Sequence, residues 1–123
     1  MAGGLQSDVL ARLRAEGGAA LVAALAALLA RTAPARLALI AHGVANNDRP
    51  GVVRAAHSLR SSAANLGALD LAAAAEAIET LAESERAWSD AERREQAATL
   101  VSERWSEVAD SVRRLAAAHV EPS

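Results

Sequence analysis

The chain contains no phenylalanine and no tyrosine, and this absence limits how it can build a hydrophobic core. Hydrophobic residues still make up 52% of its 123 residues, which is enough for one domain. The apolar volume must come mainly from Leu, Val, Ile and Ala. Ala and Leu are strong helix formers, and small Ala side chains let helices approach closely. The composition therefore predicts a single all-α domain over residues 1–123, with its core at about residues 5–118.

Apolar residues recur at helical spacing in five segments, which we expect to form helices. Their predicted bounds are 5–16, 19–45, 49–66, 69–84 and 91–118. The residues between 84 and 89 are interpreted as a connection. Because short connections make successive helices antiparallel neighbours, we predict an up-down four-helix bundle with a short additional N-terminal helix.

Capping and helix-breaking residues separate these segments. The expected N-caps are Ser7 or Asp8 for the first helix, Asp48 for the third and Asp90 for the last. Gly17 and Gly18 interrupt the chain after the first helix, and Gly67 offers a left-handed residue at the end of the third. Pro34 either kinks the second helix or divides it, and we favour a kink because the apolar register resumes beyond it.

The predicted inward faces follow from the same spacing. We expect core positions at Val53, Ala56, Leu59, Ala63 and Leu66, at Leu71, Ala74, Ala75, Ile78 and Leu81, and at Leu100, Val101, Trp105, Val108, Val112 and Leu115. Trp88 and Trp105 are interpreted as packing residues of the core or its edge.

Charge and composition narrow the function classes. With 13 basic and 15 acidic residues, the chain has a formal net charge of −2 and no electrostatic feature of a nucleic-acid-binding protein.

The chain has no cysteine, which excludes disulfides and thiolate metal sites and fits a reducing cytoplasm. The longest apolar run, 19–30, is too short to span a bilayer and follows two glycines rather than a basic segment. We therefore expect a cytoplasmic protein. The initial Met and the length favour a free-standing protein, and a fragment of a longer chain is the open alternative.

The segment 55–68 carries the residues best suited to chemistry. On a helix, Arg60, Ser61 and Ala64 share the face of His57, on the polar flank of the helix. A neutral imidazole nitrogen is a competent nucleophile near neutral pH. Arg60 supplies positive charge for phosphoryl oxygens, and the two small residues leave room for another protein. A surface histidine with a basic residue three positions on also occurs in helices without a function, so spacing alone leaves both interpretations open.

The residues from Ala56 to Ala68, AHSLRSSAANLGA, are followed by Leu71 and by the pair Ile78-Glu79. This pattern resembles the histidine-containing phosphotransfer (HPt) domain family, whose motif reads roughly A-H-x-L-K-G-x-x-x-x-x-G. The resemblance extends more weakly over the whole chain. Two positions depart from the family motif: an arginine stands in place of the usual Lys, and a serine in place of the usual Gly.

The resemblance implies a role for each matching residue. His57 corresponds to the phosphorylated histidine, and Arg60 to the residue that supports the phosphoryl group. Ser61 and Ala64 keep access to the ring open for a docking receiver domain. Gly67 closes the helix and belongs to the same docking and access region. The implied role of Glu79, on the next helix, is to orient the imidazole.

As a whole, the resemblance implies a phosphorelay intermediate without kinase activity of its own. His57 would accept a phosphoryl group from an aspartate of one response-regulator receiver domain and pass it to another, with a hybrid histidine kinase as a further partner. No cofactor is expected, because Mg²⁺ would be held by the partner receiver. We expect a monomer that binds neither nucleic acid nor a membrane.

Two alternatives remain open at this point. The bundle could bind a receiver or another helical partner without turnover, as a non-catalytic adaptor module. A dimerising phosphoacceptor helix pair of a sensor kinase also displays a histidine. That motif has an acidic residue or Asn directly after the histidine and a Pro five residues on, whereas this chain has Ser58 and Ser62 at those positions.

The other histidines are not expected to act in catalysis: His42 is near a helix end and His119 is in the tail. No two histidines share a helix face, so no metal site is predicted.

Overall fold

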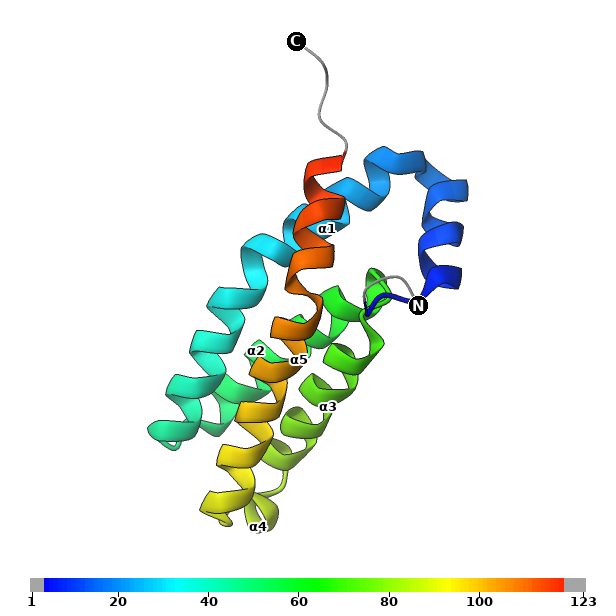
Figure 1. Ribbon diagram of the computed structural model, residues 1–123. Coiled ribbons are helices and arrows are strands. Elements are labelled where there is room, and N and C mark those ends of the chain that lie inside the picture. The colour runs from blue at the N-terminus through cyan, green and yellow to red at the C-terminus, as the bar shows by residue number, and fades with distance from the viewer. Residues whose placement is uncertain (1–3, 119–123) are drawn as a thin grey trace.

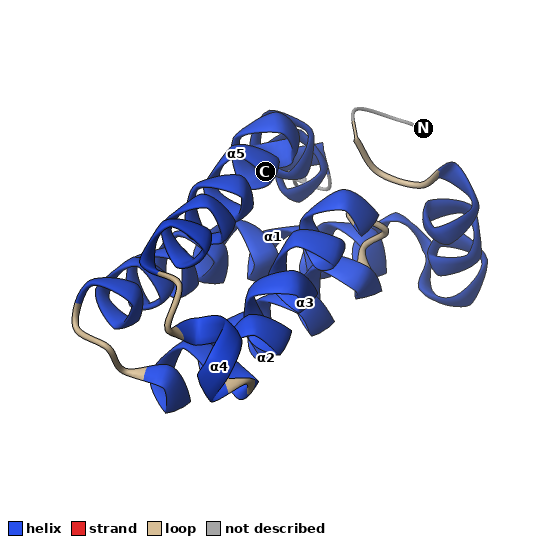
Figure 2. Cartoon of the chain, turned by 90° about the horizontal axis from the view of Figure 1, so that it is seen from below, coloured by secondary structure: helices blue, strands red, loops and turns tan. Residues whose placement is uncertain are grey.

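The computed structural model describes residues 4–118, which form helices joined by short loops (Figure 2). The helices are α1 (Ser7–Ala45), α2 (Arg49–Asn65), α3 (Leu69–Glu83), the one-turn α4 (Glu85–Trp88) and α5 (Ala91–Ala118). The described residues contain no strand. The all-α prediction is confirmed.

Four long helical segments surround one core. Helix α2 packs between α1 and α3, and α5 closes the ring by packing against α1 and α3 (Figure 1). Successive long helices run in opposite directions. Gly18 has non-helical angles (φ 70°, ψ −169°), so the residues before it form a separate arm that turns away from the rest of α1 (Figure 1). This arrangement is the predicted up-down four-helix bundle with a short additional N-terminal helix.

The helix boundaries largely follow the predicted signals. Asp48 Oδ1 accepts a hydrogen bond from the Gly51 amide at 3.0 Å, and Asp90 Oδ1 accepts one from the Arg93 amide at 3.2 Å. Helix α1 continues through Pro34 with helical backbone angles.

The predicted cap of the first helix is wrong. Neither Ser7 nor Asp8 caps it; Gln6 occupies the N-cap position without a side-chain hydrogen bond. The Gln6 amide instead donates to the Gly67 carbonyl oxygen at 2.9 Å. The arm is therefore held to the α2–α3 turn through its backbone rather than by a capping side chain.

The buried faces agree with the predicted stripes except at a few positions. All five predicted inward residues of α3 are buried, as are Val101, Trp105, Val108 and Val112 of α5. Leu100 is 36% exposed, and Val53 and Leu115 are only partly buried. For Leu100 and Val53 the reason is the helical period, because Val101 and Val52 point into the core and the adjacent residue lies about 100° around the helix.

The connection predicted at residues 84–89 contains the additional helical turn α4. Ser84 Oγ caps it by accepting a hydrogen bond from the Ala87 amide at 3.2 Å. Trp88 is buried there, and its Nε1–H donates to Asn47 Oδ1 at 2.6 Å. The guanidinium carbon of Arg94 lies 5.3 Å from the centre of the indole ring. Trp88 thus ties the α1–α2 turn to the start of α5, which agrees with its predicted packing role.

One described helix, α1, is long and apolar enough to cross a membrane by length and composition alone. Its most apolar window has a mean hydropathy of 1.6, and 28% of that window is buried within the bundle. The run 19–30, too short by itself to span a bilayer, thus lies within a helix that is long enough. Core helices of soluble proteins have the same character, and Val22, Leu29 and Ile40 of α1 belong to the buried core.

Candidate functional site

His57 projects from α2 with 58% of its side chain exposed. Its register is set by the start of the helix, where Asp48 caps the first turn and Pro50 needs no amide partner. Ser61 and Ala64 are also exposed on this face of the helix. The predicted exposed imidazole beside small residues is therefore observed.

Glu79 of α3 approaches the ring from the neighbouring helix. Its Oε2 lies 3.1 Å from His57 Nδ1, and its side chain is only 11% exposed. Among residues 4–118 it is the one charged residue that is buried. A buried carboxylate needs charged or hydrogen-bonding partners, so its position beside the imidazole is a strong constraint on both side chains.

Arg60 contacts both of these residues. Its Nε lies 3.0 Å from Glu79 Oε1, and its Nη2 lies 2.9 Å from His57 Nδ1. The contact with Glu79 is an ion pair without aligned hydrogen-bond geometry. The three side chains form a compact group, which we call the His57 triad: His57, Arg60 and Glu79.

The geometry of the His57 triad leaves one ring nitrogen available. Both recorded contacts of the imidazole involve Nδ1 and neither involves Nε2. When Nδ1 carries the proton and donates it to Glu79, Nε2 holds the lone pair. A nitrogen lone pair on a largely exposed ring, a nearby guanidinium and small neighbours are suited to attack on an external phosphorus centre.

Gly67 does not lie on the accessible surface, which corrects its predicted part in receiver docking. It has φ +83° and closes α2 in the left-handed region. It is buried beneath the N-terminal arm, where an added Cβ would stand 3.0 Å from Val9 Cβ and 3.2 Å from the Gln6 amide nitrogen. Its observed role is to end α2 and to allow the N-terminal arm to pack closely against the α2–α3 turn.

The other described histidine, His42, stands apart from the triad near the end of α1. The carbonyl oxygen of His42 accepts hydrogen bonds from the Asn46 amide at 2.9 Å and from Asn46 Nδ2 at 2.8 Å, so Asn46 satisfies this helix end. His42 lines a shallow groove between α1 and α2 with Arg36, Leu39 and Arg54. His119 lies outside the described residues. Within 4–118, no three His, Cys, Asp or Glu side chains gather to hold a metal ion.

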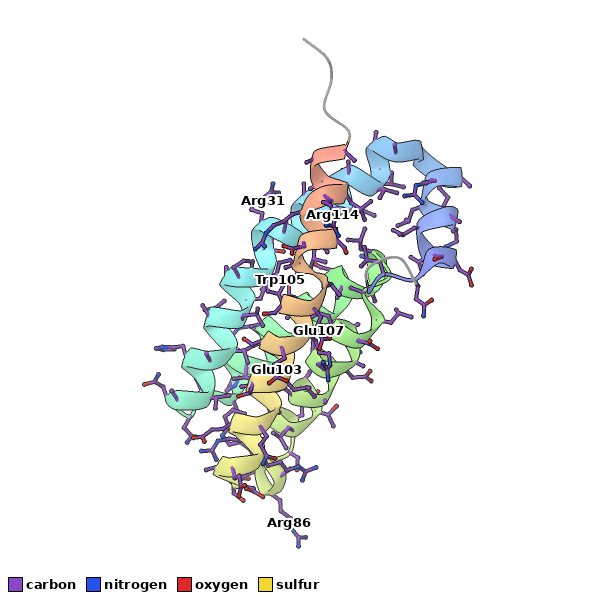
Figure 3. All side chains as sticks on the ribbon, viewed as in Figure 1. Arg31, Arg86, Glu103, Trp105, Glu107 and Arg114 are labelled. Atoms are coloured by element: carbon purple, nitrogen blue, oxygen red, sulfur yellow. The ribbon has the colours of Figure 1, made fainter. Side chains whose placement is uncertain are left out.

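Charge is divided unevenly between the two halves of the bundle, which the overall net charge concealed. Residues 19–68 contain five arginines and a single acidic residue, Asp48. Residues 69–118 contain eleven acidic residues and six arginines. Figure 3 shows Arg31 pointing outward from α1, whereas Glu103 and Glu107 come from α5. His57 therefore stands on the cationic half. A count of charges in each segment of the sequence would have revealed this uneven distribution.

Comparison with known proteins adds one finding. The family model described as "Hpt domain" matches residues 24–118, which include all three members of the His57 triad. The match runs from the apolar part of α1 to the end of α5. No curated protein and no solved structure in the comparison matches the chain.

Proposed function

The chain belongs to the Hpt domain family, and we propose that His57 is its phosphoryl carrier between aspartates of two receiver domains. Domains of this family perform histidine phosphotransfer in phosphorelays and interact with receiver domains. One observation carries the assignment to His57: its ring is exposed, while its Nδ1 contacts the buried Glu79.

The proposed transfer is an in-line displacement at phosphorus. The Nε2 lone pair attacks the phosphorus of an aspartyl phosphate and forms a P–N bond. The P–O bond to the aspartyl group breaks, and the carboxylate leaves with the bonding electrons. The proton stays on His57 Nδ1, where Glu79 accepts its hydrogen bond and offsets the positive charge of the phosphorylated ring. The reverse displacement delivers the phosphoryl group to a second receiver.

The surroundings of His57 assist mainly by positioning and electrostatics, which dominate phosphoryl-transfer catalysis. Arg60 is near enough to support the phosphoryl oxygens, since its guanidinium reaches the ring. Ser61 and Ala64 leave the approach to the ring open. In this proposal Mg²⁺ is held by the acidic pocket of the partner receiver, and the chain itself takes no cofactor.

The proposal extends to partners and location. In this proposal a hybrid histidine kinase supplies one receiver domain, and the chain acts as a cytoplasmic monomer that binds no nucleic acid and no membrane. The absence of membrane binding is supported by Val22, Leu29 and Ile40 of α1, which are buried in the core that α1 shares with α2 and α5.

A receiver-transfer assay tests the assignment. The chain is incubated with a phosphorylated receiver, and acid-labile label on the chain is measured. We expect label on the wild type and on His42→Gln, an exposed histidine outside the triad, and none on His57→Gln. Label that persists on His57→Gln would contradict the assignment. Binding by calorimetry with no phosphohistidine formed would favour the non-catalytic adaptor.

A further inference from the structure

His57 Nδ1 has two neighbours that require opposite protonation of the same atom. Glu79 Oε2, at 3.1 Å, is an acceptor and needs a proton on Nδ1. Arg60 Nη2, at 2.9 Å, is a donor and needs a lone pair on Nδ1. A neutral imidazole carries one proton, so it can form only one of these hydrogen bonds at a time.

The two hydrogen bonds select the two tautomers of the ring. With the proton on Nδ1, the bond to Glu79 forms and Nε2 holds a lone pair. With the proton on Nε2, the bond from Arg60 forms and the exposed nitrogen has no lone pair for attack. The choice between Glu79 and Arg60 therefore decides whether Nε2 is a nucleophile.

We propose that Arg60 is a positioning residue that acts as a gate on the tautomer of His57. In the free protein, its Nη2–H competes with Glu79 for Nδ1 and holds part of the population in the tautomer that cannot attack. An arriving phosphoryl group attracts the guanidinium, and Nδ1 is then left to Glu79. The ring thus becomes nucleophilic when a donor is present. This gate rests on the proposed function of His57 as phosphoryl acceptor.

The geometry of Arg60 allows this exchange without loss of its ion pair. The guanidinium has five N–H donors in a rigid plane, and its Nε, rather than Nη2, lies 3.0 Å from Glu79 Oε1. The guanidinium can turn so that Nη2 moves from His57 Nδ1 toward a phosphoryl oxygen while Nε stays beside the Glu79 carboxylate. The buried Glu79 therefore remains paired with a cation throughout.

The atoms balance over the gated step. The proton moves from Nε2 to Nδ1 through solvent when Arg60 withdraws, with no net change in the charge of the ring. Nε2 then forms the P–N bond, the aspartyl P–O bond breaks, and the aspartate leaves as the carboxylate. A doubly protonated ring would have no lone pair, so the gate operates on the neutral ring.

Imidazole ¹⁵N chemical shifts of the unphosphorylated protein test the gate, since they distinguish the two tautomers. They are recorded on the 123-residue chain with ¹⁵N-labelled histidine, at a pH where the ring is neutral. Arg60→Ala should raise the ratio of Nδ1–H to Nε2–H tautomer at His57 by about fivefold, the size expected for one lost hydrogen bond. Arg60→Met, which keeps the aliphatic length but has no donor, should give the same change.

Two further variants sharpen the test. Arg54→Ala removes an equal charge one turn earlier on α2, from a residue with no recorded contact to the ring, and should leave the ratio unchanged. Glu79→Leu removes the acceptor and should move the ratio in the opposite direction. Unchanged shifts in both Arg60 variants would overturn the gate, as would an equal response to Arg54→Ala.

The gate and the proposed function can fail separately. If the wild type accepts label on His57 but the Arg60 variants keep the wild-type tautomer ratio, only the gate is overturned. If His57 accepts no label from a phosphorylated receiver, the proposed function fails, and the gate fails with it.

Discussion

At the residue scale, the orientation of the His57 ring depends on a carboxylate that is buried. The burial of the Glu79 carboxylate is tolerated because the imidazole contacts its Oε2 and Arg60 contacts its Oε1. Removing one partner of a buried charge is costly, since the other is left without compensation. The His57 triad therefore links the stability of the α2–α3 contact to the orientation of the imidazole.

This link predicts an ordered loss of transfer in Glu79 variants. Glu79→Gln keeps an oxygen that can accept the Nδ1–H, whereas Glu79→Leu keeps none. We expect Glu79→Leu to slow transfer to His57 by about a hundredfold through loss of ring orientation, and Glu79→Gln to slow it less. Rapid-quench assays with a phosphorylated receiver measure both rates. Glu76→Gln, an exposed glutamate on the same helix, is the matched control and should transfer at the wild-type rate.

Access to the ring gives a second residue-scale prediction. Ser61 is exposed one turn beyond His57, so a larger side chain there would stand between the ring and an incoming receiver. We expect Ser61→Leu to lower the transfer rate by about a hundredfold while the protein stays folded. Ser106→Leu makes the same change on an exposed position of α5, which does not pack against α2, and should be neutral. Equal rates in both variants would show that residue 61 is not at the docking surface.

The sequence predicted the members of the His57 triad but not the contacts of Arg60 within it. Exposure of His57 followed from helical spacing, and the relation of Glu79 to the ring followed from a family resemblance. The ion pair of Arg60 with Glu79 depends on the register of α2 against α3 and on side-chain rotamers. Neither can be read from residue spacing along one helix, so the competition at Nδ1 appeared only in the structure.

At the element scale, helix boundaries were predictable where a local signal sets them. Asp48 and Asp90 cap their helices through their own side chains, and Gly18 and Gly67 adopt positive φ angles where the chain turns. The start of α1 was not predictable, because its anchor is a backbone hydrogen bond to a carbonyl sixty-one residues away in sequence, from Gln6 to Gly67. Tertiary contacts of this kind leave no local pattern.

Gly67 gives a prediction at the element scale. Gly67→Ala places a side chain at φ +83° and presses its Cβ on the N-terminal arm. We expect the free energy of unfolding to fall by about 1–2 kcal/mol from the backbone term alone, and by more where the arm must shift. Urea denaturation followed by circular dichroism measures the loss.

The same variant separates a structural role from a docking role. Because Gly67 is buried, Gly67→Ala should transfer phosphoryl groups at nearly the wild-type rate under conditions where it remains folded. Wild-type stability combined with lost transfer would instead place Gly67 in the docking surface, as the family resemblance implies.

At the scale of the whole molecule, the uneven charge indicates how a partner is recognised. Helices α1 and α2 hold the cationic excess, and Arg36 and Arg54 lie beside the exposed Leu39 in the groove between these two helices. A receiver that presents an aspartyl phosphate within an acidic pocket has the opposite sign. Opposite charges on two faces speed their encounter and fix orientation more than they add to affinity.

The uneven charge distribution predicts that the rate of phosphoryl transfer depends on salt concentration and on Arg54. Charge reversal in Arg54→Glu should lower the second-order rate of transfer by about tenfold at low salt, because it weakens electrostatic steering. The difference from wild type should largely disappear near 1 M salt, where the Debye length is about 3 Å. Arg86→Glu makes the same change on α4, an element that does not pack against α2, and should have little effect. If Arg86→Glu slowed transfer as much as Arg54→Glu, net charge rather than the cationic face would control the encounter.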